Sequence, residues 1–163
     1  MDETDRERVA LSESHTEMTE MLLPNDTNNL GRALGGVVLH WMDICGAISA
    51  MRFANQQCVT ASMDHVDFIA PIDLGEIAVI QSYVFNTGRT SIDVKVDVHS
   101  ENPRTGKHQE TTTSFLTFVA IDEGGKPIEV PDLACETEAE EDLRQIAVEK
   151  RQAELESIIE RME

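Results

Sequence analysis

Residues 35–51 read GGVVLHWMDICGAISAM, and this stretch decides the fold. From Val37 to Arg52 the residues favour a helix and leave it without a polar face, which predicts a helix buried nearly all round. One carboxylate, Asp43, lies where such a helix normally carries another apolar side chain. Burying a charge is costly unless the charge is paired or hydrogen-bonded. Asp43 is therefore either satisfied by Arg52, His40 or a backbone amide, or it is a functional carboxylate.

Two glycines precede this helix. Gly35 and Gly36 leave the amides of the first turn uncovered, at the positive end of the helix dipole. Such an end can bind an anion or polarise a carbonyl, although glycines at a helix start are often only turn formers. Asp43 also shares its face of the helix with small residues, which indicates either a closely packed second backbone or a slot for a ligand. They include Gly46, Ala47 and Ala50.

Beyond the helix the apolar period changes to two. In SIDVKVDVHS, residues 91–100, apolar residues alternate with polar ones, which is typical of a strand with one buried face. We also expect strands within 13–23, 59–68, 75–88 and 108–121. The connections between the strands that follow the helix are short and imply antiparallel neighbours, and a sheet with one apolar face needs a cover. The sequence therefore predicts an α+β fold, a curved antiparallel sheet wrapped around one central helix. Residues 136–163 are rich in Glu and predict a C-terminal helix.

The charge of the chain is unusual. Its 163 residues suffice for one domain with a sizeable core, and 31 acidic residues outnumber 13 Lys and Arg, for a net charge of −18. Because the acid is spread along the chain, we interpret it as a surface adapted to a salt-rich cytoplasm rather than as an acidic interaction module. No basic patch exists to neutralise phosphates, so nucleic acid is not an expected partner.

The N-terminal residues, the apolar runs and the cysteines predict where the protein is located and whether it binds a metal. The N-terminal residues are charged and unlike a secretory signal, and no apolar run of about 18 residues predicts a membrane span. We therefore expect a cytoplasmic protein with no membrane partner. Cys45, Cys58 and Cys135 lack metal or redox spacing, so no metal site is expected. The expected organisation is an acidic mobile leader over 1–12, a central domain over 13–131 and an acidic helical extension over 132–163.

Four sequence blocks carry a resemblance to a known family. They are LLPNDTNNLGRALGGVVLHWMDICGAISAMR (22–52), VTASMDHVDFIAPIDLGE (59–76), GRTSIDVKVDVHSEN (88–102) and TTSFLTFVAIDEGGKPIEVP (112–131). In this order they resemble the acyl-CoA thioesterases of the hotdog fold, in the branch of the bacterial short-chain acyl-CoA thioesterases and the brain-type acyl-CoA hydrolases. The resemblance covers 18–131, and the family's fold is the architecture that the periodicity predicts. One departure is Leu34, where relatives often carry an aromatic residue.

The resemblance implies hydrolysis of acyl-CoA to a free fatty acid and CoA, with no metal or organic cofactor. It implies catalytic roles for Asn28 and Asp43, which meet across a subunit interface in a homo-oligomer, a dimer or a trimer of dimers. Asp43 would act as general base or as nucleophile, and Asn28 would orient the water or the carbonyl. The amides of Gly35 and Gly36 would stabilise the oxyanion. CoA would lie along the sheet edge, against Ala61, Ser62, Met63, Arg89, Thr90, Ser91 and Ile92.

Three alternatives differ in what they require. A non-catalytic acyl-CoA sensor of the same fold would need the pocket but neither Asp43 nor Asn28. A hydratase or dehydratase would need a catalytic histidine beside the acid, and His40 is the candidate. A structural acidic oligomer leaves Asp43 and the glycine pair unexplained.

The C-terminal helix is either a subunit contact or a solvated tail; its apolar residues are Leu155, Ile158, Ile159 and Met162.

Overall fold

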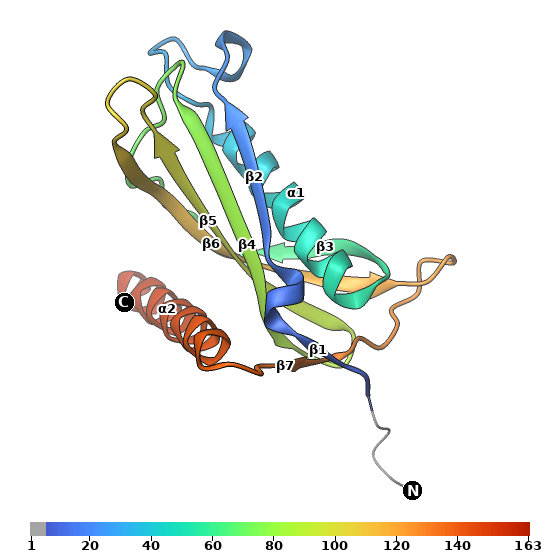
Figure 1. Cartoon of the computed structure of the whole chain (residues 1–163). Helices are drawn as coiled ribbons and strands as arrows, with labels where there is room; N and C mark the ends of the chain where they lie inside the picture. The colour runs from blue at the N-terminus through green and yellow to red at the C-terminus, as the bar shows by residue number, and fades with distance from the viewer. Residues whose placement is uncertain (1–5) are drawn as a thin grey trace, which may run out of the picture.

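The computed structural model describes residues 6–163. A five-stranded antiparallel sheet curls around one long helix, α1 (Gly35–Ala54), and a second helix, α2 (Glu138–Met162), lies against the opposite face of the sheet (Figure 1). This confirms the predicted hotdog architecture with a C-terminal helix. The other elements are β1 (Arg8–Ala10), η1 (Leu11–Ser14), β2 (Thr16–Met21), η2 (Pro24–Asp26), β3 (Gln57–Met63), β4 (Ile77–Thr87), β5 (Ser91–Glu101), β6 (His108–Ile121) and β7 (Asp132–Ala134).

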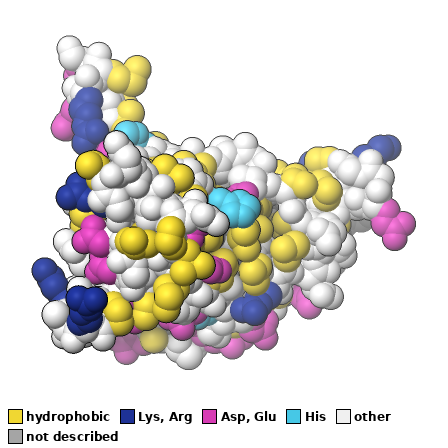
Figure 2. Space-filling view, turned by 90° about the horizontal axis from the view of Figure 1, so that it is seen from above, with side chains coloured by type: hydrophobic (Ala, Val, Ile, Leu, Met, Phe, Trp, Pro, Cys, Tyr) yellow, Lys and Arg dark blue, Asp and Glu magenta, His cyan; other side chains and the backbone are white. Residues whose placement is uncertain are grey.

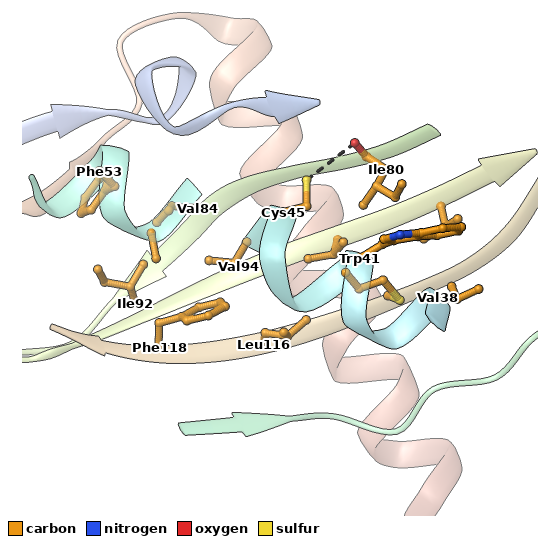
Figure 3. Packing of buried hydrophobic residues seen from close by; sticks show 14 of the residues in the cluster. Val38, Trp41, Cys45, Phe53, Ile80, Val84, Ile92, Val94, Leu116 and Phe118 are labelled. Carbon is orange, nitrogen blue, oxygen red and sulfur yellow. Dashed lines mark hydrogen bonds between the residues drawn. The ribbon is translucent and has the colours of Figure 1, made fainter. Parts of the chain in front are cut away.

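Helix α1 forms the centre of the core. It begins at Gly35, two residues before the predicted start, and ends where Asn55 takes a left-handed conformation with φ of 52°. By length and composition α1 would also pass as a membrane span, but here it packs into the sheet. Figure 3 shows its apolar side chains among those of the strands, with the Cys45 thiol hydrogen-bonded to the carbonyl of Ile80 at 3.6 Å.

The small residues of α1 bring the helix close to the sheet. A Cβ placed on Gly46 would lie 3.1 Å from two ring atoms of Phe118 and 3.4 Å from Val96. Ala50 is completely buried in the same core. The sheet therefore fills the space beside these residues. Of the two alternatives, the structure has the close packing at Gly46 and Ala50 and not the slot.

The sheet has the strand order β2-β4-β5-β6-β3, with every neighbouring pair antiparallel. Strand β5 shows the predicted alternation, because one set of its residues is fully buried against α1 and the other set faces the opposite side. The buried set is Ile92, Val94, Val96 and Val98. Strand β3 is an edge strand, and its register with β6 shifts between Thr60 and Ser62. Among the described residues, the side of β3 that does not pair with β6 is thus an open edge of the sheet.

The N-terminal segment differs from the prediction of a mobile leader. Residues 8–10 form β1, which pairs in parallel with β7 at residues 132–134, and Leu11–Ser14 form a short 3-10 helix. Leu11 and Val9 are buried, so this part of the leader prediction is wrong. Backbone hydrogen bonds to a distant segment hold it, and its polar sequence gives no sign of them. Residues 1–5 of the predicted leader lie outside the described residues.

Helix α2 is joined to the outer face of the sheet. Its N-cap residue Thr137 accepts a 3.1 Å hydrogen bond from the amide of Glu140, and the hydroxyl of Tyr83 donates to the carbonyl of Leu143 at 2.7 Å. Ala147 packs into a second apolar cluster on this face, with Leu11, Tyr83, Phe85 and Phe115. Further along α2, one flank remains exposed in the single chain: Leu155, Ile159 and Met162.

Candidate active site

Asp43 lies two turns into α1, half-buried, and its carboxylate reaches strand β3. Its Oδ1 accepts a 2.6 Å hydrogen bond from the hydroxyl of Thr60. Arg52 instead donates to the carbonyl of His15 at 3.1 Å, and His40 is exposed. Within residues 6–163, Thr60 is the hydrogen-bond partner of this carboxylate. One oxygen of Asp43 is thus oriented by the edge strand, while the other remains available for chemistry.

The position of His40 bears on the hydratase alternative. A histidine that works with Asp43 as an acid–base pair needs to lie within hydrogen-bond reach of the same substrate atom. His40 is exposed and makes no hydrogen bond to Asp43 in the described part of the chain. The geometry therefore gives no support to a second, hydratase-like function.

Asn28 is held in the turn that leads into α1. Its side-chain Oδ1 accepts hydrogen bonds from the amides of Leu30, at 2.9 Å, and Arg32, at 3.2 Å. Its own amide donates to the carbonyl of Arg32 at 2.8 Å. An asparagine that bonds the backbone two residues ahead is a common turn device, so Asn28 has a structural role in this turn as well as its expected catalytic one. The same bonds leave the side-chain NH₂ group of Asn28 to act as a donor.

A hollow of about 340 Å³ lies at the N-terminus of α1. Asn28 and Gly35 line one side of it, and the segment after β3 lines the other; its remaining lining residues are Arg32, Ala33, Val38, Phe68, Ile69, Ala70 and Pro71. A Cβ on Gly35 would lie 3.5 Å from the Phe68 ring, whereas nothing lies within 4 Å of one on Gly36. The absence of side chains at both positions keeps the start of the helix open to a ligand.

The first turn of α1 has donors to offer to that hollow. The N-cap residue Leu34 provides no side-chain cap, and the amides of Val37 and Val38 bond to its carbonyl at 3.0 and 3.2 Å. Gly35 and Gly36 are exposed, and their amides have no backbone acceptor among the described residues. Free amides at the positive end of a helix are suited to a carbonyl oxygen that gains negative charge.

The surface around this end of the molecule is apolar. Leu30 and Ile69 are 70% and 67% exposed, and Phe68 is 46% exposed. Figure 2, which views the molecule from above, shows hydrophobic side chains spread over this end between charged ones. The hollow is therefore bordered by exposed hydrophobic side chains.

Asn28 and Asp43 do not meet within one chain. Asn28 lines the hollow at the start of α1, whereas Asp43 does not line it and lies eight residues after Gly35, about 12 Å along the helix axis. Asp43 faces Thr60 at the open edge of the sheet instead. One chain thus presents two separate groups of candidate residues, one at the N-terminus of α1 and the other between the middle of α1 and β3.

The two segments predicted to bind CoA lie at one end of the sheet. Thr60 pairs with Phe118 on β6, and Phe118 pairs with Ile92 on β5, so only β6 separates the segments. Ala61, Ser62 and Arg89 are exposed. Ile92 is fully buried against α1, because it belongs to the inward-facing set of β5, so a side-chain contact of Ile92 with CoA is wrong. Of the other predicted residues, Met63, Thr90 and Ser91 are half-buried.

The cysteines do not form a reactive site. Cys45 is buried, and burial raises the pKa of its thiol. Burial also raises the pKa of Cys58 to about 11. Both groups are therefore thiols at neutral pH, which are poor nucleophiles. The part of the chain that the structure describes holds no cluster of three or more metal-ligating side chains.

Sequence reasoning missed Thr60. A threonine in a strand is ordinary, because β-branched residues favour strands, so nothing in its sequence context marked it. Its position relative to Asp43 was accessible only through the fold, since the two residues belong to different elements.

An antiparallel sheet curled around one long helix is the hotdog fold, and an open helix N-terminus at a hollow, with a carboxylate two turns further on, is suited to the hydrolysis of a thioester. The family model described as the thioesterase superfamily matches residues 30–107. The uncharacterized acyl-CoA thioester hydrolase YkhA of Bacillus subtilis is 42% identical over 138 residues, which are 85% of this chain and 80% of the relative. The chain belongs to the thioesterase superfamily, among the acyl-CoA thioester hydrolases.

Solved structures agree with this assignment. An apo-hexameric acyl-CoA thioesterase is 41% identical, with a TM-score of 0.83 over 93% of this chain and 97% of that one. The acyl-CoA hydrolase of Staphylococcus aureus, solved in complex with butyryl coenzyme A and coenzyme A, is 35% identical, with a TM-score of 0.79 over 95% of this chain and 98% of that one.

Proposed function

We propose that this protein hydrolyses the thioester of acyl-CoA and releases a free fatty acid and CoA. The observation that carries the proposal is the hollow that Asn28 and Gly35 line at the open N-terminus of α1. A thioester carbonyl placed there would meet uncapped amides and a side-chain amide donor. Membership in the acyl-CoA thioester hydrolases supports the substrate class.

The separation of Asn28 from Asp43 supports an active site shared between subunits. In this proposal Asn28 and the glycine amides of one subunit bind the carbonyl, and Asp43 and Thr60 come from its partner. The protein would then work as a homo-oligomer, a dimer or a trimer of dimers, and hexameric thioesterases of similar structure support this. A single chain would bind part of the substrate without completing the site.

Hydrolysis can follow two routes, and in both of them the atoms and protons are accounted for. As a general base, Asp43 takes a proton from water while the water oxygen bonds to the carbonyl carbon; the amides of Gly35 and Gly36 stabilise the oxyanion. Collapse breaks the carbon–sulfur bond, and the CoA thiolate takes up the proton. As a nucleophile, Asp43 forms a mixed anhydride with release of CoA, and water then hydrolyses the anhydride. In both forms Thr60 fixes the orientation of the carboxylate.

The Staphylococcus aureus acyl-CoA hydrolase supports this choice of residues. It has also been solved as mutants in which Asp43, Asn28 and Thr60 of that protein are replaced by Ala. These residue types and numbers coincide with those of the three residues proposed here.

The remaining features of the proposal concern CoA and the setting. CoA would lie along the sheet edge, where Arg89 is an exposed cation suited to a phosphate and Ala61–Met63 provide an exposed strand edge. The reaction needs no metal or organic cofactor. The protein would act in a salt-rich cytoplasm, which its net charge of −18 supports.

A thiol-release assay over acyl-CoAs of graded chain length tests the proposal. We expect hydrolysis by the wild type and a fall of kcat by about 100-fold or more in Asp43→Asn and in Asn28→Ala. Asp142→Asn, on the exposed face of α2, is the matched control and should keep the wild-type rate. Wild-type binding of acyl-CoA without thiol release would instead establish a sensor. Normal hydrolysis by folded Asp43→Asn would contradict the mechanism.

A further inference from the structure

Arg151 joins α2 to the rest of the molecule from outside the active site. Its Nε lies 3.0 Å from Oδ2 of Asp64 and its Nη2 3.4 Å from Oδ1 of the same carboxylate, so the guanidinium binds Asp64 with two donors. Its Nη1 lies 3.4 Å from Oδ2 of Asp93 on β5. The guanidinium also lies over the rings of Phe85 and Phe115, at 5.9 and 6.0 Å from their centroids.

The ion pairs of Arg151 with Asp64 and Asp93 are less exposed to water than an ordinary surface ion pair. The side chains of Arg151, Asp64 and Asp93 are only 23%, 19% and 13% exposed. Asp93 also accepts hydrogen bonds from Asn86 at 2.8 Å and from Thr117 at 2.7 Å. When the carboxylate of a largely buried ion pair also accepts other hydrogen bonds, its side chain is held in one orientation. Removing one partner then leaves a buried charge unpaired, which lowers stability strongly.

Asp64 begins a segment that leads from the ion pair to the active-site hollow. Residues 64–71, here called the wall segment, follow β3 directly and run beside β6. The amide of Asp64 donates to the carbonyl of Phe115 at 2.9 Å, and the amide of Ile69 donates to that of Thr111 at 2.9 Å. The hydroxyl of Thr112 donates to the carbonyl of Asp67 at 2.6 Å.

The two ends of the wall segment thus have different roles. Its first residue is bound by Arg151, and its last four, 68–71, line the hollow opposite Asn28 and Gly35. Phe68 approaches Gly35 so closely that a Cβ there would touch its ring. Between the two ends, α2 also borders the wall segment, because His65 and Asp67 share a second hollow with Lys150 and Glu154. A shift of α2 would therefore be transmitted to the wall of the substrate site.

We infer that Arg151 is a positioning residue for the acyl group: by holding Asp64 and Asp93 together it fixes the wall segment, and so the width of the hollow beside Asn28. Arg151 touches no reacting atom. This inference rests on the proposed function, since it assigns the hollow to the acyl group of the thioester. It gives the C-terminal helix a function in substrate selection that is additional to any subunit contact.

Arg151→Met tests the inference, because Met keeps the apolar stem over the two rings and removes the guanidinium. We expect the ratio of kcat/KM for long-chain over acetyl-CoA to change by about tenfold, while kcat for acetyl-CoA stays within a factor of about three, since the catalytic groups are untouched. Arg144→Met is the matched control: Arg144 lies on the same helix, is half-buried and makes no ion pair with any described residue. The control should keep the wild-type ratio.

Two further measurements separate positioning from general destabilisation. Hydrogen–deuterium exchange of the full chain should be faster in the wall segment of Arg151→Met, at 64–71, and unchanged there in Arg144→Met. Arg151→Lys keeps the charge without the planar fork, so its chain-length ratio should lie between those of wild type and Arg151→Met. Asp64→Asn should shift the ratio in the same direction, and the double variant Asp64→Asn/Arg151→Met should add little, because the residues act as one unit.

The outcomes are distinguishable from failure of the proposed function. Absence of thiol release by the wild type would refute the proposed function, whatever the exchange data show. A wild type that hydrolyses acyl-CoA, with the same chain-length ratio in Arg151→Met as in Arg144→Met, would overturn the inference alone. If Arg151→Met does not fold, Arg151→Lys decides: a wild-type ratio in that variant overturns the inference.

Discussion

The hydroxyl of Thr60 donates a 2.6 Å hydrogen bond to Oδ1 of Asp43, and this bond links the edge strand of the sheet to the central helix. It explains how the chain tolerates a carboxylate in an otherwise apolar helix, since a half-buried acid with an oriented partner costs little. It also leaves one oxygen of Asp43 without a protein donor among the described residues. An acid that is held by one oxygen and free at the other is suited to accept a proton or attack a carbonyl.

Replacing Thr60 by Val should therefore affect catalysis more than stability. Val has the shape of Thr without the hydroxyl, so Asp43 would lose its orientation while water still solvates it. We expect kcat to fall by about 10- to 100-fold and the free energy of unfolding to change by about 1 kcal/mol or less. Thiol-release kinetics and urea denaturation measure the two effects. Thr60→Ser keeps the hydroxyl and should retain most of the activity; a wild-type kcat in Thr60→Val would remove Thr60 from the mechanism.

Glu154 on α2 is a weak point of the folded state. Its Oε2 is buried and lacks a hydrogen-bond partner among the described residues. Burial raises the pKa of Glu154; Lys150 and His65 oppose this shift, and the nearby carboxylates of Asp64 and Asp67 add to it. Because the pKa is raised on folding, ionised Glu154 lowers stability above its folded pKa, and this cost disappears as the pH falls through that pKa.

Glu154→Gln should consequently raise the melting temperature at pH 7.5 by about 1 to 3 °C, since the side chain is partly exposed and the cost is modest. The difference from wild type should shrink as the pH is lowered towards 5. Thermal unfolding followed by circular dichroism across this range measures it. Glu160→Gln, which is exposed on the same helix, is the control and should show no such trend. A less stable Glu154→Gln at pH 7.5 would mean that the attraction of its carboxylate to the charge of Lys150 outweighs the cost of its burial.

Gly46 should not tolerate a methyl group, although Ala normally favours a helix. Gly-to-Ala in a helix interior gains about 1 kcal/mol, but overpacking of a rigid core costs about 1–3 kcal/mol. At Gly46 the new Cβ would lie 3.1 Å from the buried ring of Phe118, so we expect a net loss of about 1 kcal/mol of unfolding free energy. Gly36→Ala, with nothing within 4 Å, is the matched comparison for stability.

Urea denaturation of both glycine variants measures this difference. Phe118→Leu provides the test of mechanism, because a smaller side chain makes room for the methyl group. In the Phe118→Leu background, Gly46→Ala should cost less than in the wild type or become stabilising. An equal cost in both backgrounds would show that another contact limits the approach of α1 to the sheet.

The elements that could be predicted from the sequence are those with strong side-chain periodicity. Strand β6 has the expected bounds, 108–121, and β5 extends one residue beyond the expected 91–100. Both could be predicted because one face of each strand packs against α1, and this burial requires apolar side chains at regular positions. Strands β1 and β7 could not be predicted, since three residues held by backbone hydrogen bonds leave no side-chain pattern. Helix α1 begins two residues before its predicted start, because a glycine pair is typical of a turn.

The candidate site was predictable in part. Asp43 stood out as an acid in an apolar helix, but the role of Asn28 came from the family resemblance, because its turn geometry is ordinary. Thr60 and Arg151 gave no local signal. Arg151 is 87 residues away from Asp64 in the sequence, and only the path of α2 over the sheet brings them together. Contacts of this kind depend on the tertiary fold and not on any local pattern.

The catalytic efficiency towards acyl-CoA should depend on salt concentration, because the protein and CoA are both negatively charged. CoA is polyanionic and the chain carries a net charge of −18, so the two repel at low ionic strength. The Debye length falls from about 10 Å at 0.1 M to about 3 Å at 1 M salt, which screens this repulsion. We expect kcat/KM for an acyl-CoA to rise with salt over the low range, mainly through KM. An acyl N-acetylcysteamine thioester, which lacks the nucleotide and its phosphates, is the control and should respond less. A flat or falling profile for acyl-CoA, or an equal rise for both substrates, would contradict electrostatic repulsion as the cause.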